Sequence, residues 1–359
     1  MPDRRSFLGA LLAAGSLATT GWAAAGGPAY LAAARKPSGD YALVGLDTLG
    51  DIAFDIPLPA RGHAAAAHPV KAEAVAIARR PGTFALVLDC RTGEVRHRID
   101  APRGRHFYGH GAFSKDGTRL YTPENDIATG AGRIGIWSRD DGYARIGDVP
   151  SGGIGPHEIL RLPGSRLLAI ANGGIRTHPD TGREKLNLGT MRPNLTLMDE
   201  DGVIRDQAAL PDALHLNSLR HISAAADGRV ACAFQWQGDP YDPAPLLAVY
   251  AEGQGLRLLD VPEGRLMAMD GYAGSVAFFD GDRRIAVTSP RGSVLQVYDA
   301  RTGFERQVAQ ADVCGVAPGP LGALCTDGLG RVSRIEATGI TGLARHELAF
   351  DNHLVALPL

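Results

Sequence analysis

The sequence predicts an all-β protein, a seven-bladed β-propeller with four-stranded blades. Three observations predict it. Short apolar runs alternate with Gly, Pro and Asp turns, and no long stretch has the helical period. Histidines recur before such runs, and His63, His110 and His157 have an equal spacing of 47 residues. The two ends of the chain are complementary, because each resembles a part of one repeat.

The unit that begins at His110 shows the repeat most clearly. Four strands are expected in it, over residues 111–114, 119–123, 133–138 and 143–149. The unit from His157 repeats them at 158–162, 166–171, 194–199 and 203–207, and the unit from His221 at 222–225, 230–234, 246–250 and 256–261. The unit from His63 continues through 73–78, 84–89 and 95–99. Four strands per unit is the blade of a β-propeller.

Two further units have no histidine at this place. Turn alignment puts Gly274 and Cys314 there instead. The N-terminal segment 32–47 resembles residues 76–89 but lacks a first strand, whereas the C-terminal segment 352–359 resembles a first strand alone. Together these two segments make a seventh, composite blade, and their pairing leaves no open sheet edge.

The first strand of a propeller blade lies innermost, so residues at its start surround one mouth of the central channel. The sequence therefore predicts that His63, His110, His157, His221 and His353 meet at a single opening. The connection over residues 171–193 is too long for a plain blade, and long ordered loops are often functional. We expect it at the same mouth.

The N-terminus resembles an export signal. Arg4 and Arg5 stand in a twin-arginine motif, followed by an Ala- and Leu-rich stretch and small residues for cleavage. We expect residues 1–25 to be a signal peptide, residues 26–359 to be the propeller, and the mature protein to be periplasmic without a membrane span. The alternative is an uncleaved anchor helix. A net charge of −2 gives no electrostatic case for binding nucleic acid.

Convergent imidazoles suit a transition metal. The five histidines are therefore the candidate ligands for a metal ion, a metal chelate or a haem iron. Additional ligands are sought at His178 and Met191 in the long loop, at Cys314, and at Met267 and Met269, whose thioethers would favour copper. The alternative is structural: each histidine ties one blade to the next, and the methionines are packing residues.

The long loop carries Arg176, Asp180, Arg183 and Lys185, which could bind an anionic ligand or simply be solvated. Glu158 could act as a general base, although local pairing explains it as well. Enzyme chemistry has little other support, since the chain contains no GxSxG, HExxH or P-loop motif. Cys314 and Cys325 flank a turn, so they form either a disulfide across a hairpin or two buried thiols.

Three stretches, 172–191, 216–222 and 351–354, together with the leader, resemble an uncharacterised family of exported bacterial seven-bladed propellers. Its members are typically encoded beside imelysin-type, iron-regulated periplasmic proteins, which implies a role in iron acquisition and an imelysin-type partner. The chain is more loosely similar to the propeller domain of nitrous oxide reductase, where histidines hold a copper cluster. Gly274 and Cys314 depart from that pattern.

These observations leave three hypotheses. The first is a periplasmic protein that binds iron, another transition metal or a haem-like chelate at the histidine mouth. The second is an interaction scaffold for an uptake partner, with structural histidines. The third is a metal-dependent oxidoreductase or hydrolase.

Overall fold

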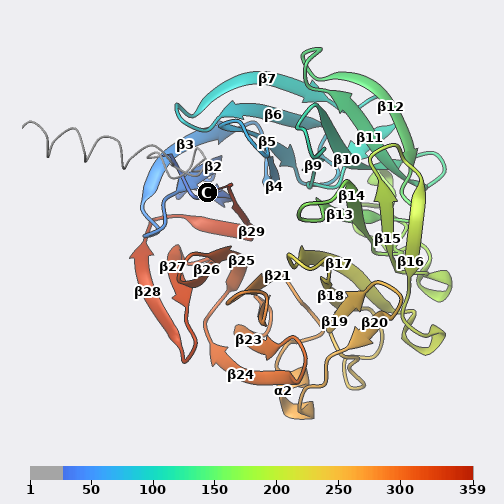
Figure 1. Ribbon diagram of the computed structural model, residues 1–359, viewed down its shortest axis with the longest axis vertical. Coiled ribbons are helices and arrows are strands. Elements are labelled where there is room, and N and C mark those ends of the chain that lie inside the picture. Colours follow the sequence, from blue (N-terminus) through green and yellow to red (C-terminus); the bar gives the residue numbers. More distant parts are fainter. Residues whose placement is uncertain (1–26, 359) are drawn as a thin grey trace, which may run out of the picture.

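The computed structural model describes residues 27–358, and within this range the chain forms seven β-sheets arranged in a circle around one axis (Figure 1). The predicted seven-bladed propeller is confirmed. The predicted signal peptide, residues 1–25, lies outside the described residues. Among the helices of the described part, none combines the length and the apolar character that crossing a membrane would require.

The circle is closed by strands from both ends of the chain, as predicted. β29 (Ala349–Ala356) is the inner strand of a sheet that continues through β1 (Tyr30–Arg35), β2 (Tyr41–Leu46) and β3 (Ile52–Leu58). Tyr30 pairs with Ala356 and Ala32 with Leu354. The last strand is thus an integral part of the fold, because it supplies the inner strand of the blade whose other three strands come from the N-terminal part of the chain and so closes the circle.

The other six sheets follow in chain order around the axis, each with its first strand innermost (Figure 1). Their strands are β4 (Gly62–Ala67), β5 (Glu73–Ala78), β6 (Phe84–Asp89) and β7 (Glu94–Asp100); β8 (Arg105–Phe107), β9 (Ala112–Phe113), β10 (Arg119–Asp126), β11 (Gly132–Ser138) and β12 (Ala144–Pro150); β13 (Pro156–Arg161), β14 (Leu167–Asn172), β15 (Asn194–Asp199) and β16 (Ile204–Ala208); β17 (Asn217–Ala224), β18 (Val230–Trp236), β19 (Leu247–Ala251) and β20 (Gly255–Leu258); β21 (Ser275–Phe279), β22 (Arg284–Ser289), β23 (Val294–Asp299) and β24 (Gly303–Ala309); and β25 (Val313–Gly319), β26 (Gly322–Asp327), β27 (Arg331–Ile335) and β28 (Ile340–Arg345).

The second of these sheets differs from the plain blade. Its inner strand is divided into β8 and β9, which both pair with β10, and the break between them contains His110. The few helical turns are short: η2 (Pro179–Thr181) and η3 (Leu188–Thr190) in the long loop, η4 (Asp212–Leu214), and α2 (Glu263–Met267).

The burial of each strand follows its place in the blade. β6, a middle strand, is buried along its whole length, whereas the outer strand β7 is almost entirely exposed. Middle strands are covered on both faces by the neighbouring blades, which is why they read as unbroken apolar runs. Hydrophobic clusters fill the space between neighbouring blades, as where Leu219, Phe234 and Val276 pack together.

Of the two states considered for Cys314 and Cys325, the structure has two buried free thiols. Gly319 pairs with Gly322, so the hairpin turn is centred between Pro320 and Leu321, one residue later than the disulfide required, and Cys325 lies opposite Val316 instead of Cys314. The Cys314 thiol lies 3.5 Å from the carbonyl oxygen of Phe350. This one-step shift of register removes the opposition on which the disulfide depended.

Candidate metal centre

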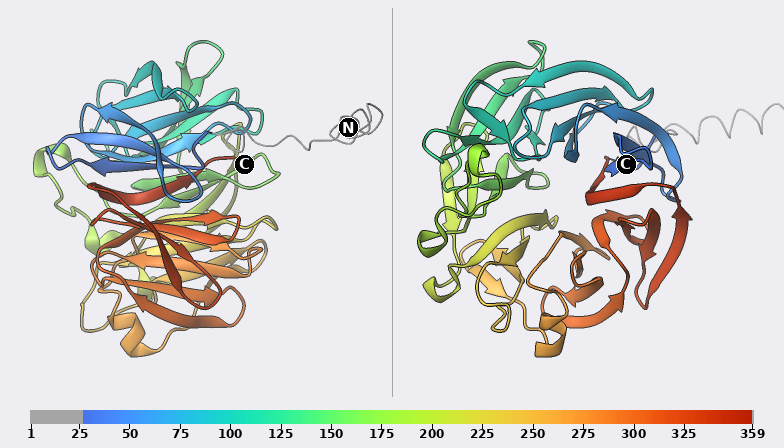
Figure 2. Two further views of the ribbon diagram at one scale, coloured as in Figure 1. Left: turned by 90° about the vertical axis from the view of Figure 1, so that its left-hand side faces the viewer. Right: turned by 180° about the vertical axis from the view of Figure 1, so that it is seen from behind.

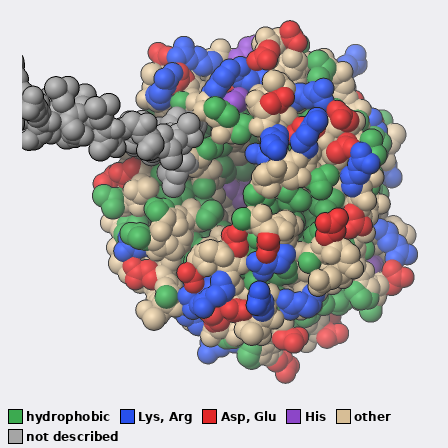
Figure 3. Space-filling view, in the orientation of Figure 1, with side chains coloured by type: hydrophobic (Ala, Val, Ile, Leu, Met, Phe, Trp, Pro, Cys, Tyr) green, Lys and Arg blue, Asp and Glu red, His purple; other side chains and the backbone are tan. Residues whose placement is uncertain are grey.

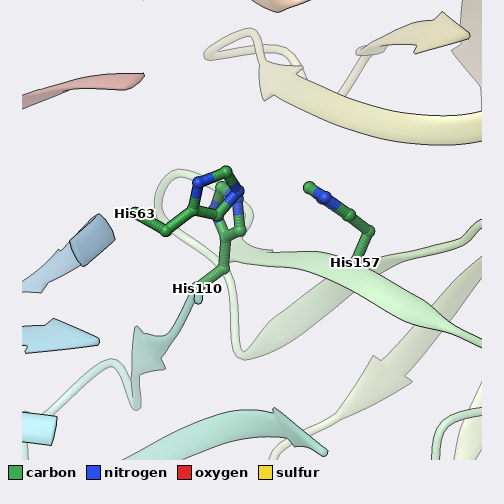
Figure 4. Close-up of side chains that lie close together, drawn as sticks. All are labelled: His63, His110 and His157. Atoms are coloured by element: carbon green, nitrogen blue, oxygen red, sulfur yellow. The ribbon is translucent and has the colours of Figure 1, made fainter. Parts of the chain in front are cut away.

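The structure brings the five predicted histidines together at the propeller axis. Each is between 2% and 6% exposed. Their imidazole rings pack directly against one another, with centroids 4.4 Å apart for His63 and His353, 4.8 Å for His157 and His221, and 5.9 Å for His110 and His221. Figure 4 shows three of them side by side. We call these five residues the histidine cluster.

The cluster comes from five consecutive blades, and the remaining two blades cannot complete it. At Gly274 a side chain would stand 2.7 Å from the ring of Pro290. Cys314 turns its thiol toward Thr326 and Phe350 in the neighbouring strands. The cluster therefore occupies one side of the axis, and neither of these two positions contributes to it.

Two groups of three histidines have ligand atoms close enough to hold a metal ion. One group is His63, His110 and His157, and the other is His110, His221 and His353. In each group the ligand nitrogens lie within 4.8 Å of one another. Because His110 belongs to both groups, its removal would affect either site.

Two carboxylates orient the cluster from outside. The Nδ1 atom of His221 lies 3.0 Å from Glu158 Oε2, and that of His110 lies 3.6 Å from Glu158 Oε1. Nδ1 of His63 lies 3.5 Å from Asp351. A carboxylate that accepts from Nδ1–H, as Glu158 does from His221, fixes the tautomer that leaves Nε2 as a ligand, an arrangement typical of metal-binding histidines. Nε2 of His63 lies 3.2 Å from Nε2 of His353. Glu158 thus contacts histidines of both neighbouring blades.

The two carboxylates differ in their electrostatics. Burial raises the pKa of Glu158 to about 8. Burial also opposes the ionisation of Asp351, but the nearby His63, Arg61 and Arg79 outweigh this and hold its pKa well below the usual range. The environment therefore favours the ionised form of Asp351, whereas burial favours the neutral form of Glu158.

The histidines themselves are held neutral. Burial lowers the pKa of His63 to about 3 and lowers the pKa of the other four well below the usual value. Neutral imidazole is the form that binds metals. Three nitrogens of the cluster, His63 Nδ1, His110 Nε2 and His157 Nδ1, are buried and have no hydrogen-bond partner among the residues that the structure describes. The donor set therefore fits a metal ion.

The additional ligands proposed from the sequence lie elsewhere. His178 is outside the cluster and accepts a hydrogen bond from the backbone N–H of Asp180, capping η2. Met191 is fully buried at the end of η3, Met269 packs in the core between blades, and Met267 is exposed on α2. None of the three methionines lines a cavity that touches the histidines.

The histidines lie between two cavities. The first, of about 460 Å³, follows the channel and touches His110, His221 and His353; alanines of the inner strands are the commonest residues in its walls. Figure 3 looks into this hollow, with histidine side chains at its bottom. The second, of about 210 Å³, touches His63, His157 and His221. We call the second cavity the vestibule.

The vestibule lies on the opposite face from the C-terminus, under the long loop, which is seen from behind in Figure 2. Arg183 and Lys185 of the loop line it, as the anion-binding reading requires. Arg176 lies instead against the turn at Gly130, and Asp180 is exposed and close to His178. The structure thus separates the four loop residues into two that line the vestibule and two that do not.

Sequence reasoning missed several residues of this region. Asp351 was overlooked, as were four arginines that line the vestibule: Arg79, Arg80, Arg220 and Arg291. The sequence nevertheless contained a pattern that could have identified these arginines. Arg79, Arg80 and Arg291 lie in connections between the second and third strands of their blades, the same place as the long loop, and these connections meet at one mouth. Arg220 directly precedes His221.

Fold and site together define the class of this protein: a seven-bladed β-propeller that gathers buried histidines from five blades at its axis. The chain belongs to the family described as "Protein of unknown function (DUF1513)", which it matches over residues 56–357. No curated protein matches it.

Among solved structures, the chain is similar to hydrazine synthase of Kuenenia stuttgartiensis, with a TM-score of 0.60 and 13% sequence identity, over 89% of this chain and 96% of that one. At this identity the likeness concerns the fold alone.

Proposed function

We propose that the protein binds a transition-metal ion at the histidine cluster and takes part in metal acquisition in the periplasm. One observation carries this proposal: five neutral, buried imidazoles meet at one point, and some of their nitrogens have no hydrogen-bond partner among the residues that the structure describes. Unpaired polar atoms in a protein interior cost about 1–3 kcal/mol each, so they are rare without a function.

The ligand set favours a metal of intermediate character. Imidazole nitrogens suit iron, zinc, copper(II) and nickel, whereas a copper(I) site would call for thiolate or thioether ligands. Since the methionines and Cys314 lie away from the cluster, we favour iron over copper. The resemblance to proteins encoded beside iron-regulated, imelysin-type partners points the same way.

A metal ion fits the cluster better than a haem. The imidazole rings are in contact, with centroids as close as 4.4 Å, so no gap between them would admit a porphyrin. The twin-arginine leader supports a periplasmic location, where such an ion would be captured or handed to a partner protein.

Metal analysis of the protein purified from periplasm tests the proposal. We expect stoichiometric metal in the wild-type protein and its loss in the variant His110→Ala, because His110 belongs to both groups of ligands. His178→Ala is the matched control, since that histidine is outside the cluster. Metal-free wild-type protein that also fails to take up Fe²⁺, Zn²⁺ or Cu²⁺ would refute the proposal and favour the scaffold.

A further inference from the structure

The vestibule is the most strongly charged cavity beside the histidines. Six cationic side chains line it, and among its described lining residues none is Asp or Glu; the six are Arg79, Arg80, Arg183, Lys185, Arg220 and Arg291. Asp351, beside His63, is engaged by Arg61 at 2.5 Å and lies 3.8 Å from Arg79, so it offsets the charge of at most one of the six. The vestibule therefore has a large excess of positive charge, although the whole chain has a net charge of −2.

Arg220 shows that this excess is built into the interior. Its side chain lines the vestibule but is only 8% exposed, and its Nε has no hydrogen-bond partner among the described residues. Burial, and then the charge of Arg80, lower its pKa to about 9. A buried guanidinium without a counter-charge is strongly unfavourable, and an anionic ligand in the vestibule would relieve this cost.

The walls hold the other cations in place around the same space. Arg80 donates to Thr177 at the root of the long loop at 3.0 Å, which ties the loop to the blade two positions away around the axis. Arg291 stacks over the Tyr272 ring, with its guanidinium carbon 4.7 Å from the ring centroid. Asn352 donates to the Tyr272 hydroxyl at 3.0 Å. The site is thus preorganised, and only Arg183 and Lys185 come from the exposed loop.

We propose that the vestibule binds a small polycarboxylate, which carries the metal to the histidine cluster as an anionic chelate. This inference rests on the proposed function for the metal, but the anion site stands on its own residues. A free cation approaching through the vestibule would be repelled by six positive charges, whereas an anionic complex would be attracted and concentrated there. His63, His157 and His221 line the floor, so the bound chelate lies against the metal ligands.

Size and geometry select the ligand class. A cavity of about 210 Å³ has room for roughly seven water molecules at ~30 Å³ each, which exceeds an inorganic phosphate and is too small for a drug-sized molecule. Five of the six cations are arginines, whose planar forks match carboxylates with two parallel hydrogen bonds. A di- or tricarboxylate meets both conditions.

Calorimetric titration of the metal-free full-length protein with citrate, and separately with inorganic phosphate, tests the proposal. We expect citrate to bind, more tightly than phosphate and more weakly as salt increases. Arg220→Met and the loop variant Arg183→Gln/Lys185→Gln should each weaken citrate binding at least ten-fold. Arg176→Gln, in the same loop but away from the vestibule, should leave it unchanged.

The outcomes separate the two proposals. Citrate binding that is absent, or unaffected in both the Arg220 and the loop variants, overturns the anion site, and phosphate binding as tight as citrate overturns the polycarboxylate assignment. If Arg220→Met fails to fold, the loop variant still decides, because its two residues are exposed. His110→Ala should lose metal but keep citrate, since His110 is not part of the vestibule wall. Citrate binding without metal uptake in the wild-type protein would refute only the metal site.

Discussion

Replacing His157 by leucine distinguishes a metal ligand from a structural histidine. The two side chains are similar in size, and His157 is 6% exposed with its Nδ1 unpaired among the described residues. In a structural role, the substitution would remove a useful contact. In a ligand role, it removes a polar atom that the metal-free protein leaves unsatisfied.

The magnitudes favour a stability gain. Removing the buried Nδ1 of His157, which is unpaired among the described residues, should raise the free energy of unfolding by about 1–3 kcal/mol. Losing the edge-to-face contact with His221, whose ring centroid lies 4.8 Å away, should lower it by roughly 0.5–1.5 kcal/mol. Metal-free His157→Leu should therefore be as stable as the wild-type protein or more stable, by up to about 2 kcal/mol. Metal held by the group of His63, His110 and His157, at a hundred times its Kd, should stabilise the wild-type protein by about 2.7 kcal/mol and the variant by much less.

Denaturant unfolding, first with a chelator and then with added Fe²⁺ under anaerobic conditions, measures both effects. His106→Leu is the matched control. His106 is equally buried but lies outside the cluster, with its Nδ1 2.9 Å from the carbonyl oxygen of Phe107. It should lose stability and keep the metal effect. The reasoning is refuted if His157→Leu loses more than about 1 kcal/mol without metal and retains the full metal-induced stabilisation.

Three further predictions concern the surroundings of the cluster. The free energy of unfolding of the metal-free protein should fall as the pH drops below about 6.5, by at least ~1.4 kcal/mol per pH unit. The five histidines have lowered pKa values in the folded protein, so the unfolded chain takes up more protons in this range. Glu158, whose pKa is raised to about 8 in the folded protein, opposes this effect by one proton. Urea unfolding between pH 7 and 5 measures it, and stability that rises toward pH 5 would contradict it. Glu158→Gln should weaken metal binding about 10- to 100-fold without unfolding the protein, because the carboxylate orients His221 and His110. A chelator competition titration measures the metal affinity, and an unchanged affinity would show that the carboxylate does not orient these ligands. Gly109→Ala should lower the free energy of unfolding by about 1–3 kcal/mol and reduce metal uptake, because Gly109 has φ +104° and a new Cβ would stand 2.7 Å from the Cβ of His63. Gly104→Ala is the control: at φ +79° and in open space, it should destabilise the protein less and leave metal uptake intact. Equal losses in the two variants would count against the contact with His63.

The local pattern of the chain was sufficient for the propeller. Each blade is made of short strands separated by tight turns, and the four-strand period is visible because neighbouring strands in a blade are also neighbours in sequence. The closure between β29 and β1 was predictable as well, because each terminal segment keeps the pattern of the part of a blade that it supplies. The disulfide alternative was wrong because the hairpin turn is centred between Pro320 and Leu321, one residue later than expected, and the sequence pattern does not fix that position.

What the sequence by itself determined is the architecture and the convergence of five histidines, because both follow from a repeat in which equivalent residues occupy equivalent places. Only the tertiary structure decided how closely the imidazoles pack, that Glu158 and Asp351 serve as their partners, and that Arg79, Arg220 and Arg291 face one vestibule. Glu158, Asp351 and Arg220 come from different blades and do not occupy one position of the repeat, and although Arg79 and Arg291 lie in equivalent connections, the sequence does not say where their side chains point. Their meeting depends on side-chain direction and on the closure of the whole circle, which the order of residues along the chain does not express.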